Sequence, residues 1–181
     1  MKKILLTGLP RIGKTTIIKK VVYSLSRKGY PFRGFYTEEV KEKGKRTGFK
    51  IITINGPQEF LAHVSFKGPY RVGKYGVDVE ALERILPSIK PASLNEIVVI
   101  DEIGKMECFS RKFKNLILTL LSTQNPFLAT IALKGDSFIE KIKGMRGIRL
   151  IQVTRENRNR LPEELERLLG VSPGNFSLQP F

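Results

Sequence analysis

A glycine-rich segment near the N-terminus constrains this sequence more than any other feature. Residues 8–15 read Gly-Leu-Pro-Arg-Ile-Gly-Lys-Thr and match the pattern G-x-x-x-x-G-K-[ST] at every fixed position. The apolar run in residues 2–7 predicts a buried strand before this segment. Apolar residues at helical spacing in residues 14–28 predict a helix after it. A glycine loop between a strand and a helix is the context of a phosphate-binding P-loop, the Walker A motif.

Each fixed position of this motif has a chemical reason. Gly8 and Gly13 allow the backbone to turn so that successive N–H groups point at phosphate oxygens, and the start of the helix adds partial positive charge there. We expect Lys14 to reach the β- and γ-phosphates, Thr15 to offer its hydroxyl to Mg²⁺, and Thr16 to lie at the α-phosphate. The residues expected to contact the nucleotide are Gly8, Leu9, Pro10, Arg11, Ile12, Gly13, Lys14, Thr15 and Thr16.

A second signal is an acidic pair at the end of a predicted strand. Residues 97–100 are four β-branched apolar residues, and Asp101 and Glu102 follow them directly. In an open parallel sheet, ligands bind at the carboxyl ends of the strands. We expect Asp101, as in a Walker B motif, to hold Mg²⁺ through water together with Thr15. Glu102 is then placed to orient or deprotonate the water that attacks the γ-phosphate, and Lys14 is its catalytic partner.

The remaining pattern predicts an α/β fold, the P-loop NTPase fold. We expect a mostly parallel sheet flanked by helices, with an inserted antiparallel hairpin. A stretch punctuated by Gly and Pro covers residues 67–76 and predicts no element. Further strands are expected at residues 32–40, 49–54, 60–66, 97–100, 127–133 and 148–153, and further helices at residues 79–86, 109–121, 137–143 and 162–169.

Length and composition favour one domain. A chain of 181 residues with 41% hydrophobic residues can bury one core, so we expect one domain over residues 1–170 and a flexible tail over residues 171–181. No apolar run approaches the ~20 residues needed to span a membrane. The first apolar segment is too short for a signal peptide, so we expect a cytoplasmic chain without a membrane partner. A single cysteine and a single histidine exclude a zinc cluster, so any metal must use oxygen ligands.

The charge balance favours anionic partners. The chain has 32 Lys and Arg against 17 Asp and Glu, a formal net charge of +15, which suits nucleotides, nucleic acid or an acidic surface. Because the charges are dispersed, a solvated basic surface of the kind found in thermophiles explains them equally well. Nucleic acid is therefore an open partner and not a required one. The sequence does not fix the oligomeric state, for which we favour a monomer.

Several segments together resemble a known family, the Thep-type nucleoside triphosphatases. This family was first described from thermophiles and includes the vertebrate cancer-related nucleoside triphosphatase. The resemblance covers the chain from residue 1 to about residue 169. It implies slow hydrolysis of ATP, GTP, CTP and UTP to the diphosphate and phosphate, with Mg²⁺ as cofactor and a broad base preference. The segments that carry it are residues 8–16, GFYTEE at 34–39, VGKY at 72–75, DEIGKME at 101–107 and TRENR at 154–158.

The resemblance also implies that residues 101–108 lie against the nucleotide. Lys105 has two open interpretations: a catalytic group that neutralises charge on the phosphoryl oxygens, or a solvated loop charge. Glu107 either pairs with Lys105 or caps the helix expected from residue 109. The residues of this segment are Asp101, Glu102, Ile103, Gly104, Lys105, Met106, Glu107 and Cys108.

Two further segments carry polar residues near predicted strand ends. Thr37, Glu38 and Glu39 lie near the γ-phosphate or in a second metal shell in one interpretation, and are solvated hairpin residues in the other. The segment after the last predicted strand contains Arg155 and Asn157, which can stack on or hydrogen-bond the base. A basic lead-in to the last helix explains the same residues without a ligand.

These patterns predict a magnesium-dependent nucleoside triphosphatase and leave two alternatives. The first alternative is a small-molecule or nucleotide kinase, which an arginine-rich lid segment would favour. The sequence lacks such a segment, and the acidic pair favours water as the acceptor. The second alternative is a nucleotide-switched nucleic-acid-binding protein, whose hydrolysis RNA or DNA would stimulate. Neither adjacent strands with paired aromatic residues nor another RNA-recognition signature supports it.

Overall fold

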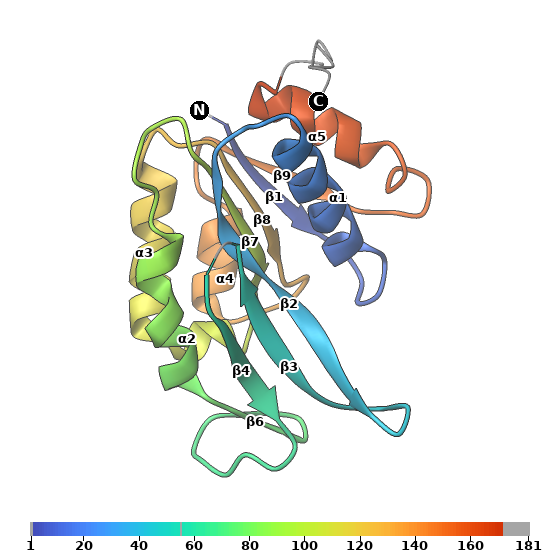
Figure 1. Ribbon diagram of the computed structural model, residues 1–181, viewed down its shortest axis with the longest axis vertical. Coiled ribbons are helices and arrows are strands. Elements are labelled where there is room, and N and C mark those ends of the chain that lie inside the picture. Colours follow the sequence, from blue (N-terminus) through green and yellow to red (C-terminus); the bar gives the residue numbers. More distant parts are fainter. Residues whose placement is uncertain (1, 55, 172–181) are drawn as a thin grey trace, which may run out of the picture.

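One mixed sheet forms the centre of the computed structural model, which describes residues 2–54 and 56–171 (Figure 1). The strands are β1 (Lys3–Thr7), β2 (Phe32–Glu42), β3 (Lys45–Thr53), β4 (Gln58–His63), β5 (Arg71–Val72), β6 (Tyr75–Val77), β7 (Ile97–Ile103), β8 (Phe127–Ile131) and β9 (Ile148–Gln152). The helices are α1 (Lys14–Arg27), α2 (Val79–Ile85), α3 (Arg111–Ser122), α4 (Ser137–Lys143) and α5 (Leu161–Leu169), with short 3-10 turns η1 (Leu86–Ile89) and η2 (Glu107–Phe109). Among the described residues the strand order is β5-β6-β4-β3-β2-β7-β8-β1-β9.

Five neighbouring strands of this sheet run parallel to one another, in the order β2, β7, β8, β1 and β9. β1 pairs with β8 and β9, and β7 pairs with β8 and β2, all in parallel register. Every residue of β1 and of β8 is buried, as expected for strands with helices on both faces. The predicted α/β fold is therefore confirmed.

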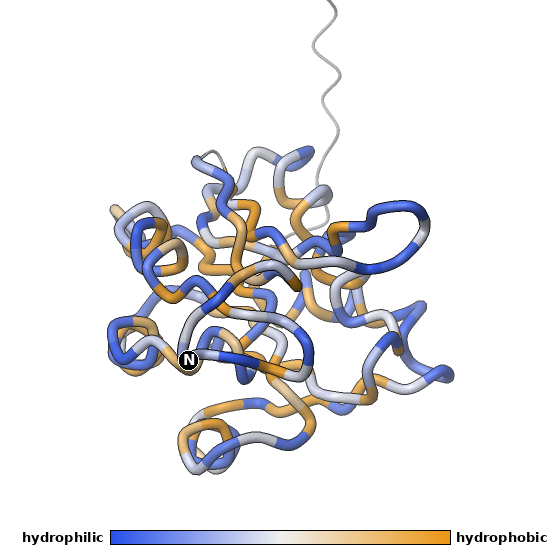
Figure 2. Tube along the Cα trace, turned by 90° about the horizontal axis from the view of Figure 1, so that it is seen from below, coloured by the Kyte–Doolittle hydropathy of each residue, from blue (hydrophilic) through white to orange (hydrophobic). Residues whose placement is uncertain are grey.

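Alternate side chains of the central strands point to two separate cores. On β7, Ile97 and Val99 pack with α1 and α5, whereas Val98 and Ile100 pack with α2, α3 and α4. This period of two is the pleat of the strand. The helical turns in Figure 2 alternate between hydrophilic and hydrophobic residues, as expected for helices that cover a sheet with one face. Among the described residues, none of the helices is long and apolar enough to cross a membrane.

The antiparallel part of the sheet is larger than the hairpin expected from the sequence. β2 continues to Glu42 and pairs with β3, and β4, β6 and β5 extend the sheet outward in antiparallel register. The strands β5 and β6 lie in the stretch for which the sequence predicted no element. They are joined by a tight turn at Gly73, whose φ is 57°. This glycine, which in the sequence suggested an irregular stretch, therefore forms the turn of a small hairpin.

Gly34 lets β2 approach β7 closely at the base of this extension. A Cβ at this position would lie 1.6 Å from the carbonyl oxygen of Val99, and φ of Gly34 is 139°. Only glycine fits this contact. The position therefore connects the parallel and antiparallel parts of the sheet.

The ends of the elements differ from the expected ends by a few residues, for local reasons. α3 begins at Arg111 and not at residue 109, because the Ser110 hydroxyl accepts a hydrogen bond from the Phe113 N–H at 3.0 Å and caps the helix. The segment before it forms η2 instead. Val171 is buried against the core that contains α1 and α5, one residue beyond the expected domain end. The rest of the expected tail, residues 172–181, lies outside the described residues.

Candidate active site

The glycine loop lies between β1 and α1, as the sequence predicted. Gly8 has φ 151° and Gly13 has φ 115°, both in the region that favours glycine. A Cβ on Gly8 would lie 2.9 Å from the carbonyl oxygen of Val153, so a side chain there would collide with the end of β9. No side chain caps the N-terminus of α1, and its first turn holds no acidic residue. Its N–H groups are therefore free to bind an anion.

Lys14 connects this loop to the end of β7. Its Nζ donates to the carbonyl oxygens of Gly8 at 3.1 Å and Leu9 at 3.4 Å. The same Nζ lies 3.9 Å from Oε2 of Glu102. Only 11% of the Lys14 side chain is exposed, so its charge is concentrated between the loop and the acidic pair.

A β-bulge in β7 lies at the acidic pair, Asp101 and Glu102. Ile100 lies opposite Ala129 but Ile103 lies opposite Ile131, so β7 contains one more residue than β8 at this point. Asp101 is buried there, and its Oδ1 accepts a hydrogen bond from the Thr130 hydroxyl. The peptide bond between Asp101 and Glu102 is cis.

The other carboxylate oxygen of Asp101 has the environment of a metal ligand. Oδ2 is buried and has no hydrogen-bond partner within the described residues. Burial raises the pKa of this carboxyl, and the hydroxyls of Thr130 and Thr15 and the nearby lysine charges act in the opposite direction. The described residues hold no group of three or more His, Cys, Asp or Glu that could bind a metal. Mg²⁺ does not require one, because it is usually held by one or two protein oxygens plus water and phosphate.

Thr130 was not predicted as a site residue. It is fully buried in β8, among the apolar residues Phe127, Leu128, Ala129 and Ile131. One polar residue inside an apolar parallel strand is the sequence signal that points to such a partner, because a buried hydroxyl needs a hydrogen bond.

Glu107 lies beside Glu102 and is more deeply buried. A Cβ built on Gly104 would lie 2.8 Å from Oε2 of Glu107 and 3.0 Å from Oε1 of Glu102, so both carboxyls face the same small space. Burial raises the pKa of Glu107 to about 8, and the charge of Glu102 adds to the rise. Burial also raises the pKa of Glu102, whereas Lys14 lowers it.

Neither interpretation that the sequence left open for Glu107 is present. Ser110 caps α3, and Glu107 forms no ion pair with Lys105 within the described part of the chain. Lys105 is exposed at the edge of the cleft, whereas the Glu107 carboxyl points inward. Glu107 is buried because it begins η2, the short turn that packs against the core directly after β7.

A cleft of about 1150 Å³ brings most of the predicted residues together. Leu9, Ile12, Asp101, Ile103 and Cys108 do not line it. The side chains of Ile103 and Cys108 are buried in the core with α2, α3 and α4, and burial raises the pKa of the Cys108 thiol to about 12. The predicted residues that line the cleft are Gly8, Pro10, Arg11, Gly13, Lys14, Thr15, Thr16, Glu102, Gly104, Lys105, Met106 and Glu107, and Thr37, Glu38 and Glu39 line it as well.

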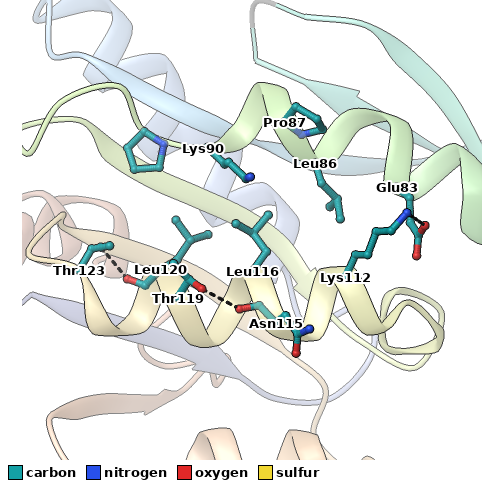
Figure 3. Close-up of a pocket in the computed structure, with 11 residues that line it drawn as sticks. Glu83, Leu86, Pro87, Lys90, Lys112, Asn115, Leu116, Thr119, Leu120 and Thr123 are labelled. Atoms are coloured by element: carbon teal, nitrogen blue, oxygen red, sulfur yellow. Dashed lines mark hydrogen bonds and ion pairs between the residues drawn. The ribbon is translucent and has the colours of Figure 1, made fainter.

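A second cavity of about 670 Å³ lies away from these residues, between η1 and α3 (Figure 3). Leu86, Leu116 and Leu120 line it, and an ion pair between Lys112 and Glu83 at 2.8 Å lies at one end. None of the predicted site residues lines this cavity.

Comparison with known proteins identifies the family. A family model described as NTPase matches residues 3–166. The chain belongs to the NTPase family. It is 43% identical over 174 residues to a protein named nucleoside-triphosphatase THEP1 from Thermotoga sp. (strain RQ2), covering 95% of this chain and 98% of the relative. It is 39% identical over 175 residues to the human cancer-related nucleoside-triphosphatase, covering 88% and 92%.

Two solved structures share the fold of this NTPase. The crystal structure of THEP1 from the hyperthermophile Aquifex aeolicus matches with a TM-score of 0.83 and 36% identity, over 92% of this chain and 98% of the other. The solution structure of a human cancer-related nucleoside triphosphatase matches with a TM-score of 0.82 and 36% identity, over 96% and 100%. The resemblance and the P-loop NTPase fold are thus confirmed, and the chain is an enzyme of a hydrolase family.

The segment after β9 of the NTPase lies beside the P-loop and contacts it through Arg158. The Asn157 side chain accepts from the Thr154 N–H and donates to the Gln152 carbonyl, both at 2.8 Å, so it holds a turn. Arg155 is exposed and does not line the cleft. Instead, Nη1 of Arg158 donates to the carbonyl oxygen of Ile12 at 3.4 Å. The last residue of the TRENR segment is therefore the one that touches the P-loop.

The acidic residues of β2 in the NTPase are paired. Glu38 binds Lys19 of α1 at 2.5 Å, and Glu39 binds Arg46 of β3 at 2.6 Å. Both carboxylates line the cleft. Both are exposed hairpin residues, as one interpretation expected, and each is held in an ion pair with a basic side chain.

Proposed function

We propose that this chain is a magnesium-dependent nucleoside-triphosphate phosphatase that hydrolyses ATP, GTP, CTP and UTP to the diphosphate and phosphate. The observation that carries the proposal is the meeting of Lys14 and Glu102 at 3.9 Å, across the gap between the P-loop and the end of β7. That gap is where the γ-phosphate of a P-loop-bound nucleotide belongs. The names of the relatives point to the same activity.

Most residues of the site bind the phosphates or the metal ion in this proposal. The N–H groups of the loop and of the first turn of α1 bind phosphate oxygens, and the Lys14 ammonium binds the β- and γ-phosphates. Thr15 and the unpartnered Oδ2 of Asp101 would hold Mg²⁺. The ion would neutralise charge on the phosphates when it is bound. Thr130 keeps the Asp101 carboxylate in place through its hydrogen bond.

Glu102 is the residue that acts on water. Its carboxylate lies beyond Lys14 as seen from the loop, half-buried, with 34% of the side chain exposed. A carboxylate there can accept a hydrogen bond from a water molecule and take its proton as the oxygen attacks the γ-phosphorus. The diphosphate leaves with the electron pair of the broken bond. Lys105, exposed at the cleft edge, is an additional cation for the phosphoryl oxygens in this proposal.

A broad base preference agrees with the contacts around the loop. Phosphate recognition by backbone N–H groups carries no information about the base. The amide of Asn157, which could read a base edge, is already engaged in the turn after β9. Slow turnover, a cytoplasmic location and a monomeric state are further parts of the proposal, and nucleic acid stays an open partner that the proposal does not require.

The test is phosphate release from each of the four triphosphates, with Mg²⁺ and with excess chelator. We expect release that requires Mg²⁺, with rates within about tenfold of one another across the four bases. Lys14→Ala should lower it by about 100-fold or more, the size typical for loss of one group that stabilises developing charge. Lys20→Ala is the matched control, because Lys20 is exposed on the same helix and does not line the cleft.

The opposite results would end the proposal. Release that continues unchanged in the presence of chelator would refute the metal requirement. Equal rates for the parent and Lys14→Ala, with Lys20→Ala also unchanged, would show that phosphate release does not use the P-loop.

A further inference from the structure

Gly104 keeps space open between two carboxyl groups. Its φ does not lie in the left-handed region, so the backbone conformation is not what favours glycine at this position. The neighbouring side chains are. A Cβ there would lie 2.8 Å from Oε2 of Glu107, 3.0 Å from Oε1 of Glu102 and 3.1 Å from Cγ of Glu102. A side chain on Gly104 would therefore push Glu102 and Glu107 apart.

The two carboxylate oxygens of Glu102 have different neighbours. Oε2 lies 3.9 Å from Nζ of Lys14. Oε1 is the oxygen on the side of Gly104, where Oε2 of Glu107 also lies. Lys14 therefore holds one end of the Glu102 carboxylate, and Glu107 is placed at the other end.

The surroundings of the two carboxyls place the charge on Glu102 and the proton on Glu107. Two carboxylates side by side in a buried space repel each other, so such a pair shares one proton. Glu102 has Lys14 beside it and 34% of its side chain exposed. Glu107 is only 5% exposed and forms no ion pair within the described residues.

The pKa of Glu107 agrees with this assignment. Burial raises it to about 8, and the charges of Glu102 and Asp101 add to the rise. The backbone N–H groups of Glu107 and Gly104 oppose the rise without cancelling it. Glu107 is therefore a neutral acid at pH 7, and its O–H group can donate a hydrogen bond.

The turn that carries Glu107 is fixed from both sides. The Cys108 N–H donates to the carbonyl oxygen of Gly104 at 3.0 Å, and the Ser110 N–H donates to that of Glu107 at 3.1 Å. The Ser110 hydroxyl caps α3 and donates to Oε1 of Glu83 on α2 at 2.8 Å. Glu107 therefore has a defined place relative to the end of β7, as a residue that orients another must have.

We propose that Glu107 is a positioning residue for Glu102: as a neutral acid, it donates a hydrogen bond to Oε1 of Glu102 across the space beside Gly104. The inference rests on the proposed function, in which Glu102 takes the proton of the attacking water. Burial raises the pKa of Glu102, and a hydrogen bond to the carboxylate favours its ionised form. Glu107 keeps its own proton throughout, and the proton of the water passes to Glu102.

The experiment measures kcat and KM for ATP with Mg²⁺ at pH 7 in three variants of the full chain. Glu107→Met keeps the length of the side chain but has no donor, so kcat should fall about 10- to 100-fold, the size of one hydrogen bond to a charged group. Glu107→Gln keeps an N–H donor, so kcat should stay within about threefold of the parent. Gly104→Ala alters neither carboxyl but separates them, so kcat should fall about tenfold or more. KM for ATP should change by less than about threefold in all three, because none of these groups binds the phosphates.

Matched controls separate positioning from general effects of substitution. Gly68→Ala places a Cβ where no atom lies within 4 Å, outside the cleft, and should keep the parental kcat. Glu163→Met, at an exposed position of α5, should do the same. Urea unfolding checks that each variant is folded. If Glu107→Met does not fold, the difference between Glu107→Gln and Gly104→Ala decides.

A double-mutant cycle tests whether Glu107 acts through Glu102. In the Glu102→Gln background, Glu107→Met should lower the remaining rate by less than about threefold, because the residue that it orients is already disabled. An equal loss in both backgrounds would mean that Glu107 supports the fold and not Glu102, and would overturn the inference. A loss in Glu107→Gln as large as in Glu107→Met would overturn it too, since the donor would then have no role.

The two proposals fail in different ways. Release of phosphate that Lys14→Ala abolishes, together with the parental kcat in Glu107→Met and Gly104→Ala, overturns the positioning role and leaves hydrolysis at the P-loop standing. Release that Lys14→Ala does not change overturns the proposed function and this inference with it.

Discussion

Replacing Glu107 by glutamine should make the protein more stable at alkaline pH. The Glu107 carboxyl is buried beside Glu102, and burial raises its pKa from 4.5 to about 8. The folded protein therefore keeps this proton to a higher pH than the unfolded chain. The resulting contribution to stability is fully present below about pH 4.5 and is lost as the pH rises toward 8. Glutamine resembles the protonated acid in shape and does not titrate.

The size of the effect follows from the two pKa values. A tenfold difference in proton affinity corresponds to about 1.4 kcal/mol. Between pH 5 and pH 9, the free energy of unfolding of the parent should therefore fall by about 4 kcal/mol relative to that of Glu107→Gln. This is a large part of the ~5–15 kcal/mol that stabilises a domain.

Urea unfolding at pH 5, 7 and 9 measures the difference. Comparing parent and variant at each pH cancels the groups that titrate in both. Glu163→Gln is the control, because Glu163 is exposed on α5 and forms no ion pair within the described residues, so this variant should follow the parent closely. A difference between parent and Glu107→Gln that stays constant from pH 5 to pH 9 would refute the reasoning, since it would mean that the buried carboxyl ionises as it does in water.

Two other substitutions test the site and the sheet. Glu102→Gln should lower phosphate release by about 100- to 10,000-fold with little change in nucleotide affinity, because it removes the proton acceptor. Glu59→Gln, outside the cleft, should release phosphate like the parent, and an equal rate in both variants would contradict the role of Glu102. Gly34→Ala should cost about 3 kcal/mol or more in urea unfolding, because its Cβ would lie 1.6 Å from the Val99 carbonyl oxygen. Gly68→Ala, where a Cβ meets no atom within 4 Å, should unfold like the parent; similar losses in both would argue against this contact.

Much of the fold could be read from local sequence patterns. The strand, glycine loop and helix of residues 3–27 involve neighbours along the chain, so periodicity and motif spacing predict them well. The acidic pair after residues 97–100 was equally readable, because a run of β-branched residues that stops at a charge marks a strand end. The small hairpin of β5 and β6 was not, because its strands have only two or three residues and the hairpin joins the sheet through the pairing of β6 with β4.

The candidate site depended more on distant contacts. Thr130 meets Asp101 only because β8 lies beside β7 with a bulge between them, and no local pattern encodes that register. Arg158, and not Arg155 or Asn157, reaches the P-loop because the turn after β9 uses the Asn157 amide. A segment could be predicted, but not which of its side chains faces the ligand.

The sequence by itself therefore determined the P-loop, the acidic pair and the alternation of strands and helices, since these are properties of a few consecutive residues. The tertiary structure alone decided which of these segments meet. Parallel pairing of β1 with β8 and of β8 with β7 brings Lys14 within 3.9 Å of Glu102, although 88 positions of the numbering separate them. The same packing buries Glu107 and leaves one oxygen of Asp101 without a partner. Burial and the distance between charges belong to the packed molecule, and the order of residues does not contain them.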